Sequence, residues 1–191
     1  MGNKYPIKCV LDTNVIYPLW LRDILLWFAF YDLFIPKWSS TIFDEWIRVM
    51  HRKGINHREA LRRVKVMNDA FPDAQVKNYE SIISSLDLPD QNDRHVLAAA
   101  IRSKSSFIIT RNLKDFPSII LNPFGIQAVS PDLFLSALVK IYPIQTVLAF
   151  RKLVKNKTRP LFTEEEVLLI LQKNNLRKTA KEIKLLLDLQ F

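Results

Sequence analysis

Four acidic side chains lie where predicted strands end or where predicted helices begin. They are Asp12, Glu45, Asp93 and Asp115. Asp12 follows the apolar run at residues 7–11, and Asp115 lies in the loop after the apolar run at 107–110. Glu45 lies one turn inside a predicted helix, and Asp93 begins another. Because the ligands of a parallel α/β sheet collect outside the carboxyl ends of its strands, we expect these carboxylates to converge on one crevice.

Converging carboxylates favour a hard divalent cation, Mg²⁺ or Mn²⁺. Carboxylates a few ångströms apart repel one another, and without a cation some of them would stay protonated. Taken singly, each acid also has an ordinary structural explanation: Asp12 as a helix cap, Glu45 as an exposed helix residue and Asp115 as a turn residue. Asp93 is equally explained as a first-turn charge that the helix dipole favours. The metal hypothesis therefore depends on the joint pattern.

An alternation of short apolar runs and helical segments must position these acids. Strands are predicted at residues 7–11, 33–36, 107–110 and 126–129, with a further strand and a short helix within 75–88. Helices are predicted at 15–31, from the capping residues 39–41 to Gly54, at 57–71, from Asp93 through residue 101 and from Ser130 onward. Strands that alternate with helices form a parallel or mostly parallel sheet, so we predict an α/β fold.

A polar and basic stretch at residues 156–160 marks a boundary near the end of the chain. Thr163 and the three glutamates after it match a capping box, and two short helices are predicted at 164–173 and 178–189. Residues 151–191 contain ten basic and five acidic residues, against 18 and 14 in the first 150. We therefore predict one domain at residues 1–150 and a basic helical extension at 151–191.

The composition excludes several classes of protein. With 191 residues, 49% of them hydrophobic, the chain is long enough to bury a core as one domain with a short appendage. Three glycines exclude a Gly-rich phosphate loop, and a single cysteine, Cys9, excludes an intrachain disulfide and a cysteine-rich zinc site. We expect a reducing, cytoplasmic location and no membrane span. The formal net charge of +9 is explained either by a polyanionic partner, such as nucleic acid, or by plain solubility.

A basic stretch covers the end of one predicted helix and the start of the next. It contains His51, Arg52, Lys53, Arg58, Arg62, Arg63 and Lys65. Such a stretch can hold phosphates, and it is also explained as a solvated face. His95 follows Asp93 closely, but the sequence offers no second histidine or cysteine to complete a zinc site with it, and we predict that His95 is an exposed helix residue.

Four blocks of the sequence resemble, in order and spacing, the PIN domain, the nuclease fold of VapC-type toxins. The blocks are Val10-Leu-Asp-Thr-Asn-Val15, Glu45 within a helix, Asp90-Gln-Asn-Asp-Arg-His-Val-Leu-Ala-Ala-Ala100 and Ile109-Thr-Arg-Asn-Leu-Lys-Asp-Phe-Pro117. The resemblance covers residues 7–130, and the last two blocks are its most specific part. The tail from Thr163 is similar to the small helical extension of one bacterial PIN subgroup.

The resemblance implies a PIN-like three-layer α/β fold with a mostly parallel central sheet, and a metal-dependent ribonuclease activity. The catalytic positions that it implies are Asp12, Glu45, Asp93 and Asp115. The main ligands of Mg²⁺ or Mn²⁺ would be Asp12 and Asp93. The supporting or substrate-contacting positions would be Asn14, Asp90, Thr110 and Asn112. Many members carry an acid in place of Asn112, so the choice between Asn112 and Asp115 at the metal is open.

The sequence thus predicts a Mg²⁺-dependent endoribonuclease that hydrolyses RNA phosphodiester bonds as the toxin of a type II toxin–antitoxin pair. Its expected partners are RNA, a protein antitoxin and, as a further candidate, a second copy of the chain in a homodimer. One alternative is an RNA-binding module of the same fold without catalysis, which the intact acids argue against. The other is a haloacid-dehalogenase-like phosphatase, whose chemistry requires a second aspartate at the position of Asn14.

Overall fold

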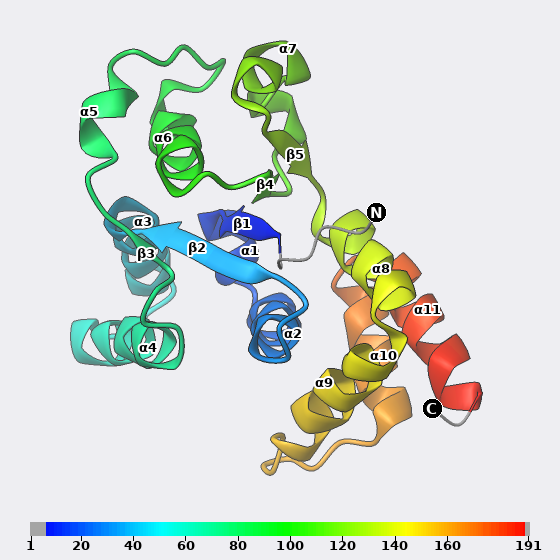
Figure 1. Ribbon diagram of the computed structural model, residues 1–191. Coiled ribbons are helices and arrows are strands. Elements are labelled where there is room, and N and C mark those ends of the chain that lie inside the picture. Colours follow the sequence, from blue (N-terminus) through cyan, green and yellow to red (C-terminus); the bar gives the residue numbers. More distant parts are fainter. Residues whose placement is uncertain (1–6, 190–191) are drawn as a thin grey trace. The chain divides into compact units, whose positions relative to one another are not determined.

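The computed structural model describes residues 7–189, which form two compact units. The sheet unit consists of Ile7–Tyr17 and Ile35–Val129, and the helical unit consists of Pro18–Phe34 and the described residues from Ser130 onward. The strands of the described residues, drawn as arrows in Figure 1, lie within the residue ranges of the sheet unit. The division of the chain into a domain at residues 1–150 and a basic helical extension at 151–191 stays a prediction.

The sheet unit is built on a five-stranded sheet in which every neighbouring pair of strands is parallel. The strands are β1 (Lys8–Leu11), β2 (Ile35–Ser39), β3 (Gln75–Val76), β4 (Phe107–Ile109) and β5 (Gln127–Val129). Their order is β3-β2-β1-β4-β5, which makes β1 the central strand. Cys9, Val10 and Leu11 are buried, as expected for a parallel strand that is covered on both faces. The predicted α/β fold with a mostly parallel sheet is confirmed.

Helices flank this sheet. They are α1 (Thr13–Ile16), α3 (Ser40–Arg52), α4 (His57–Ala70), α5 (Glu80–Ile83), α6 (Arg94–Ser103) and α7 (Ser118–Leu121), with the 3₁₀ turns η1 (Gln91–Asp93), η2 (Leu113–Asp115) and η3 (Asn122–Phe124). Helix α6 contacts β1, β2 and β4, and its run of three alanines at 98–100 is buried. Because alanine side chains are small, α6 lies close to the strands, and its first turn is brought near their carboxyl ends.

The start and end of α3 follow from local chemistry. The Ser39 hydroxyl accepts a hydrogen bond from the backbone N–H of Ile42 at 3.3 Å, which satisfies one of the unpaired donors of the first turn. After the last turn Gly54 adopts a φ of +80°, a conformation that favours glycine. The helix predicted between the capping residues and Gly54 is confirmed, and Glu45 lies on it.

The single helix predicted at residues 15–31 is wrong. The chain forms α1, which ends at Ile16, and then α2 (Leu19–Phe30), with Pro18 between them. Proline has no backbone N–H to continue a helix, so it begins a new one instead. The consequence is large, because α1 belongs to the sheet unit and α2 to the helical unit.

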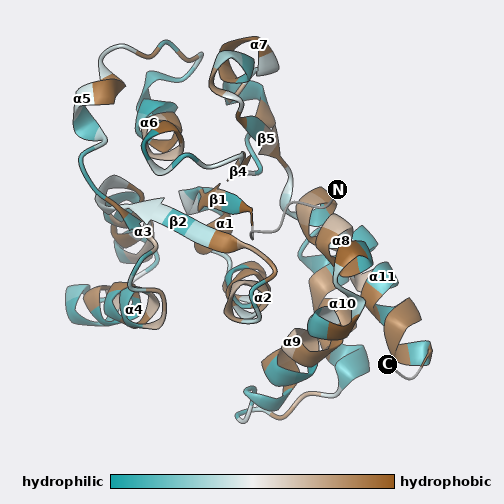
Figure 2. Cartoon of the chain, viewed as in Figure 1, coloured by the Kyte–Doolittle hydropathy of each residue, from teal (hydrophilic) through white to brown (hydrophobic). Residues whose placement is uncertain are grey.

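The helical unit contains α2, α8 (Pro131–Ile141), α9 (Pro143–Lys155), α10 (Glu164–Lys173) and α11 (Arg177–Asp188). The capping box at Thr163 is present, and both helices predicted after it are confirmed. Helix α11 is amphipathic: Ala180 and Ile183 are buried, whereas Lys181 and Lys184 are exposed. Figure 2 shows both hydrophilic and hydrophobic residues along this helix. None of the helices within the described part of the chain is sufficiently long and apolar to cross a lipid bilayer.

Asp132 joins two helices of this unit. It lies in the first turn of α8, and its carboxylate accepts the backbone N–H groups of Lys178 at 3.0 Å and Thr179 at 2.8 Å. The Thr179 hydroxyl also donates to Asp132 Oδ1 at 2.8 Å. Asp132 therefore caps the start of α11 from a neighbouring helix, a role that its sequence position does not reveal.

Candidate active site

The candidate site lies at the carboxyl ends of β1 and β4, where the strand order reverses. From β1 the chain continues to β2 and β3 on one side, while β4 and β5 lie on the other. The backbone N–H of Asp12 donates to the carbonyl of Ile109 at 3.2 Å and so continues the pairing of these two strands. The residues that follow β1 and β4 therefore meet at one edge of the sheet, where open α/β sheets bind their ligands.

Asp12 is buried and held by two side chains. It is 4% exposed, and its Oδ2 accepts hydrogen bonds from Asn14 Nδ2 at 2.5 Å and Thr110 Oγ1 at 2.7 Å. Asn14 is fixed in turn, because its Oδ1 accepts the backbone N–H of Arg111 at 2.9 Å. Burial raises the pKa of Asp12, and the hydrogen bond from Thr110 offsets part of the effect. Asn14 and Thr110 thus support Asp12 by direct contact.

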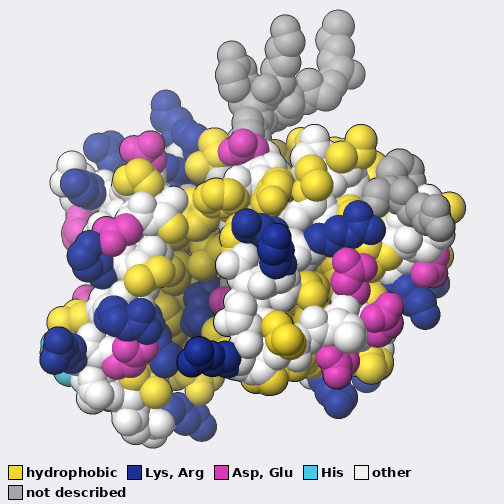
Figure 3. All heavy atoms as spheres, turned by 90° about the horizontal axis from the view of Figure 1, so that it is seen from below, with side chains coloured by type: hydrophobic (Ala, Val, Ile, Leu, Met, Phe, Trp, Pro, Cys, Tyr) yellow, Lys and Arg dark blue, Asp and Glu magenta, His cyan; other side chains and the backbone are white. Residues whose placement is uncertain are grey.

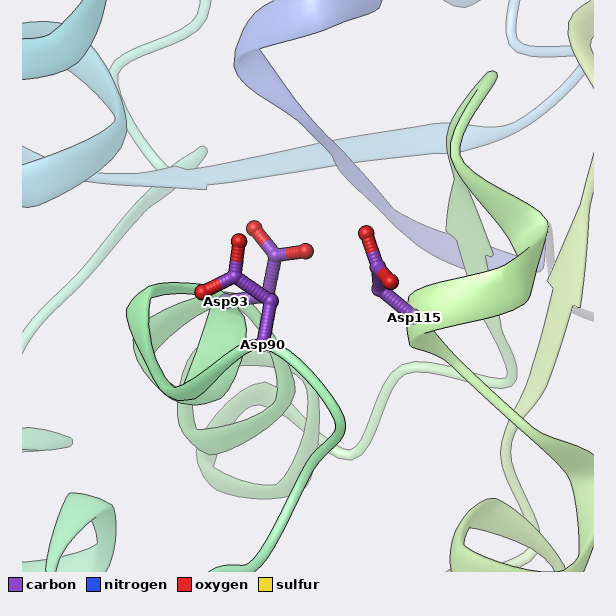
Figure 4. A group of neighbouring side chains, drawn as sticks. All are labelled: Asp90, Asp93 and Asp115. Atoms are coloured by element: carbon purple, nitrogen blue, oxygen red, sulfur yellow. The ribbon is translucent and has the colours of Figure 1, made fainter.

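Three aspartates lie close enough to share one cation. This acidic triad consists of Asp90, Asp93 and Asp115, each of which offers a carboxylate oxygen within 4.8 Å of the others. Figure 4 shows Asp90 and Asp93 on the same turn of the chain, with the side chain of Asp115 across from them on η2. Asn112 Nδ2 donates to Asp115, and the backbone N–H of Asn92 donates to Asp90 at 2.9 Å. Asp90 and Asp115, the two outer members of the triad, are therefore each held in place by an amide group.

Asp93 carries the least favourable charge in the triad. Burial, together with the negative charges of Asp12, Asp90, Asp115 and Glu45, raises the pKa of Asp93 to about 7, and burial is the largest cause. Asp93 Oδ2 is buried, and none of the described residues gives it a hydrogen bond. A divalent cation would satisfy this oxygen and relieve the repulsion among the carboxylates. The acidic triad therefore fits a hard, oxygen-preferring metal ion.

Glu45 is fixed by two neighbours. Thr13 Oγ1 donates to Glu45 Oε2 at 2.6 Å, and His95 Nε2 lies 3.1 Å from Glu45 Oε1. Burial acts to raise the pKa of Glu45, but the hydrogen bonds from His95 and Thr13, together with the charges of His95 and Arg48, outweigh it, and the pKa is lowered. Glu45 is therefore ionised at neutral pH. The prediction that His95 is exposed is wrong: it is 6% exposed, because α6 packs against the sheet.

The predicted site residues fall into three groups. Asp12, Asn14 and Thr110 form the first, and the acidic triad with Asn112 forms the second. The backbone N–H of Asn112 donates to Thr110 Oγ1 at 3.0 Å and joins these two groups. Glu45 belongs to the third group and lies outside the triad, as does Asp12. Ligation of a metal by Asp12, predicted from the sequence, stays a prediction.

Thr13 and His95 are the site residues that sequence reasoning missed. Thr13 stands between Asp12 and Asn14, and its residue type alone does not distinguish it from an ordinary residue at a helix start. His95 interrupts the apolar run of α6, where Val96 and Leu97 are fully buried. A polar residue beside such a run indicates a buried hydrogen bond, and that was the available signal.

Comparison with known proteins identifies the family of this fold and site. Residues 8–114, more than half of the chain, match the model of the PIN domain, so the chain belongs to the PIN-domain family. Residues 131–185 match the model of the VapC50 C-terminal domain. The resemblance seen in the sequence is thereby confirmed.

A curated relative matches part of the chain. It is the Mycobacterium tuberculosis protein named "Putative ribonuclease VapC50", which is 37% identical over 90 residues. The match covers 47% of this chain and 53% of the relative, so the chain spans about half the length of the curated relative that it matches.

Without metal, the acidic triad is expected to make the stability of the protein fall as the pH rises. The pKa of Asp93 is about 7 in the folded chain and near the ordinary aspartate value when unfolded, so the folded state binds more protons between these values. Stability from this group is full below about pH 4 and is lost as the pH rises through about 7. Because a half-exposed carboxylate is screened by water, we expect a loss of about 1–2 kcal/mol.

Thermal melts in EDTA at about pH 5 and about pH 8 would measure this loss of stability. The variant Asp93→Asn removes the carboxyl group that causes the loss. At the higher pH, Asp93→Asn should raise the melting temperature by about 2–6 °C, and Mn²⁺ should raise that of the parent more than that of the variant. Asp87→Asn, an exposed aspartate of the same unit, is the control. Equal pH dependence of the parent and Asp93→Asn would contradict the repulsion inferred here.

Proposed function

We propose that the chain is a Mg²⁺- or Mn²⁺-dependent endoribonuclease and the toxin of a type II toxin–antitoxin pair. The observation that carries this proposal is the acidic triad at the strand reversal of a PIN-family sheet. Its member Asp93 has a buried Oδ2 that accepts no hydrogen bond from the described residues. The name of the mycobacterial relative, which describes a ribonuclease, supports the same activity.

The residues that would hold the cation are Asp93, its triad partners and, as predicted from the sequence, Asp12. When bound, a divalent cation supplies positive charge to the scissile phosphate and lowers the pKa of water. The chain prepares the site for it: Asn112 and Asn92 fix the outer triad members, while Asn14 and Thr110 fix Asp12.

Glu45 is the residue that we assign to the attacking water. Its lowered pKa keeps it ionised, so it accepts hydrogen bonds and cannot donate them. Thr13 and His95 restrict its side chain to one orientation. A carboxylate fixed in this way can orient a water molecule and take up its proton during attack on phosphorus. Asp115, held by Asn112, would complete the triad on the other side.

The proposed partners follow from charge. The chain has a net charge of +9, while its candidate site is acidic. An antitoxin that is acidic overall and inserts one arginine or lysine into the triad would match both features. Membership in the PIN family leaves the phosphatase alternative without support. The alternative of an RNA-binding module without catalysis differs from the proposed endoribonuclease only in the expected outcome of a cleavage assay.

The test is cleavage of a mixed pool of RNA by the purified chain, with millimolar Mg²⁺ or Mn²⁺ and with EDTA. We expect internal cleavage with either metal and none with EDTA. Co-expression with the product of the neighbouring gene should yield a complex that does not cleave. Binding of RNA without cleavage under all metal conditions would favour the non-catalytic alternative. An active chain that cells tolerate at high expression would contradict the toxin role but leave the nuclease activity standing.

A further inference from the structure

Positive charge is concentrated in one segment of the sheet unit. Residues 48–65 contain seven basic residues and a single acid, Glu59, a net charge of +6 out of +9 for the chain. This basic segment runs from the second half of α3, through the turn at Gly54, into α4. Figure 3 shows Lys and Arg side chains grouped on the left, the side on which α3 and α4 lie in Figure 1.

Part of this charge is neutralised within the segment and part is not. The Glu59 carboxylate forms ion pairs with Arg62 at 2.7 Å and with Arg63 at 2.8 Å, so both of these arginines have an acidic partner. Across the described residues, no carboxylate lies within 4.0 Å of a charged nitrogen of Arg52, Lys53 or Arg58, and all three are exposed. These three side chains hold positive charge that the fold does not use.

The basic side chains of α3 begin next to the candidate site. Glu45, Arg48 and Arg52 are three and seven residues apart, so they lie along one face of α3. Arg48 Nη2 is 3.9 Å from Glu45 Oε1, and the Arg48 side chain is 63% exposed. At 1.5 Å per residue, Arg52 lies about 10 Å along the helix from Glu45. A line of cations therefore begins beside a site residue and leads away from it.

Two exposed rings lie within the same segment. The His51 and His57 rings are 5.4 Å apart, one at the end of α3 and the other at the start of α4. Single-stranded RNA offers both phosphates for cations and unstacked bases for planar side chains. A lipid surface or an acidic protein offers the negative charge alone, so the mixture of cations and rings favours RNA.

We propose that Arg48, Arg52, Lys53 and Arg58 form a phosphate track that guides single-stranded RNA along α3 to the acidic site. The proposal rests on the proposed function, which makes RNA the substrate. The backbone phosphates pair with the four cations, and the His51 and His57 rings contact bases where the strand passes the turn. Four phosphate contacts predict a slope of log Kobs against log salt concentration of about −3.

The test measures binding of a fluorescently labelled single-stranded RNA in EDTA, so that no cleavage takes place. The variant is Arg52→Gln/Lys53→Gln/Arg58→Gln, three exposed changes outside the triad. Its salt slope between about 50 and 200 mM should be less steep by about 2, and its affinity at low salt should fall about 10- to 100-fold. The control is Lys173→Gln/Lys181→Gln/Lys184→Gln, which removes three exposed cations of the helical unit and lowers the net charge equally.

The control variant should keep the parent slope. Equal weakening by both triple variants would overturn the track, because net charge alone would then explain binding. Unchanged RNA binding by Arg52→Gln/Lys53→Gln/Arg58→Gln would also overturn the track. The same holds if this variant loses binding to anionic lipid vesicles and not to RNA. If that variant does not fold, the slope of the parent decides: a value near zero contradicts the track. Because binding is measured without metal, failure of the cleavage assay is a separate result that concerns the proposed function.

Discussion

Replacing Asp93 with asparagine is expected to reduce RNA cleavage by about a thousandfold or more, the loss typical of removing a direct metal ligand. Asparagine keeps the shape of the side chain and can still begin α6, so the fold should survive. What disappears is the charge that a hard cation requires. The assay is cleavage of a mixed RNA pool with Mg²⁺ or Mn²⁺, with circular dichroism to confirm folding.

The matched control for this variant is Asp87→Asn, which changes an exposed aspartate of the sheet unit. It should cleave at the rate of the parent. Asp132→Asn is less suitable, because the Asp132 carboxylate accepts three hydrogen bonds at the start of α11. Cleavage by Asp93→Asn at the parent rate would mean that the acidic triad is not the catalytic centre.

The next largest effect is expected for His95, a positioning residue that acts through Glu45. His95→Leu removes the hydrogen bond to Glu45 Oε1 and leaves the buried space filled. Loss of such an outer hydrogen bond typically lowers activity by about 10- to 100-fold. Because the bond orients a proposed catalytic carboxylate, the decrease should fall on kcat, with KM little changed.

His95→Gln separates positioning from packing. A glutamine amide can donate from about the place of the imidazole Nε2, so this variant should recover much of the lost kcat. Melting temperatures of both variants show whether the fold is intact. Equal kcat for His95→Leu and His95→Gln, in proteins that fold equally well, would show that the hydrogen bond to Glu45 does not matter for the reaction.

Local chemistry determined a large part of the fold. The central strand is an apolar run with a cap former after it, and α3 begins at a serine cap and ends before a glycine at positive φ. The capping box at Thr163, which begins α10, is also a local signal. Each signal lies within a few residues of the structure that it specifies, and so the strand alternation, the α/β class and the acids at strand ends could all be predicted.

Long-range packing decided what the sequence could not show. The apolar spacing at residues 15–31 predicted a single helix, and only the tertiary contacts place α2 with the C-terminal helices, across more than a hundred residues. Asp90 read as a supporting residue, yet the turn at the start of α6 brings it to Asp115, which follows a different strand. His95 became a partner of Glu45 because α6 buries it near α3. The sequence by itself determined which side chains could carry charge at the sheet edge; the strand order and the packing of α6 decided which of them meet, because contacts between residues far apart depend on the whole fold.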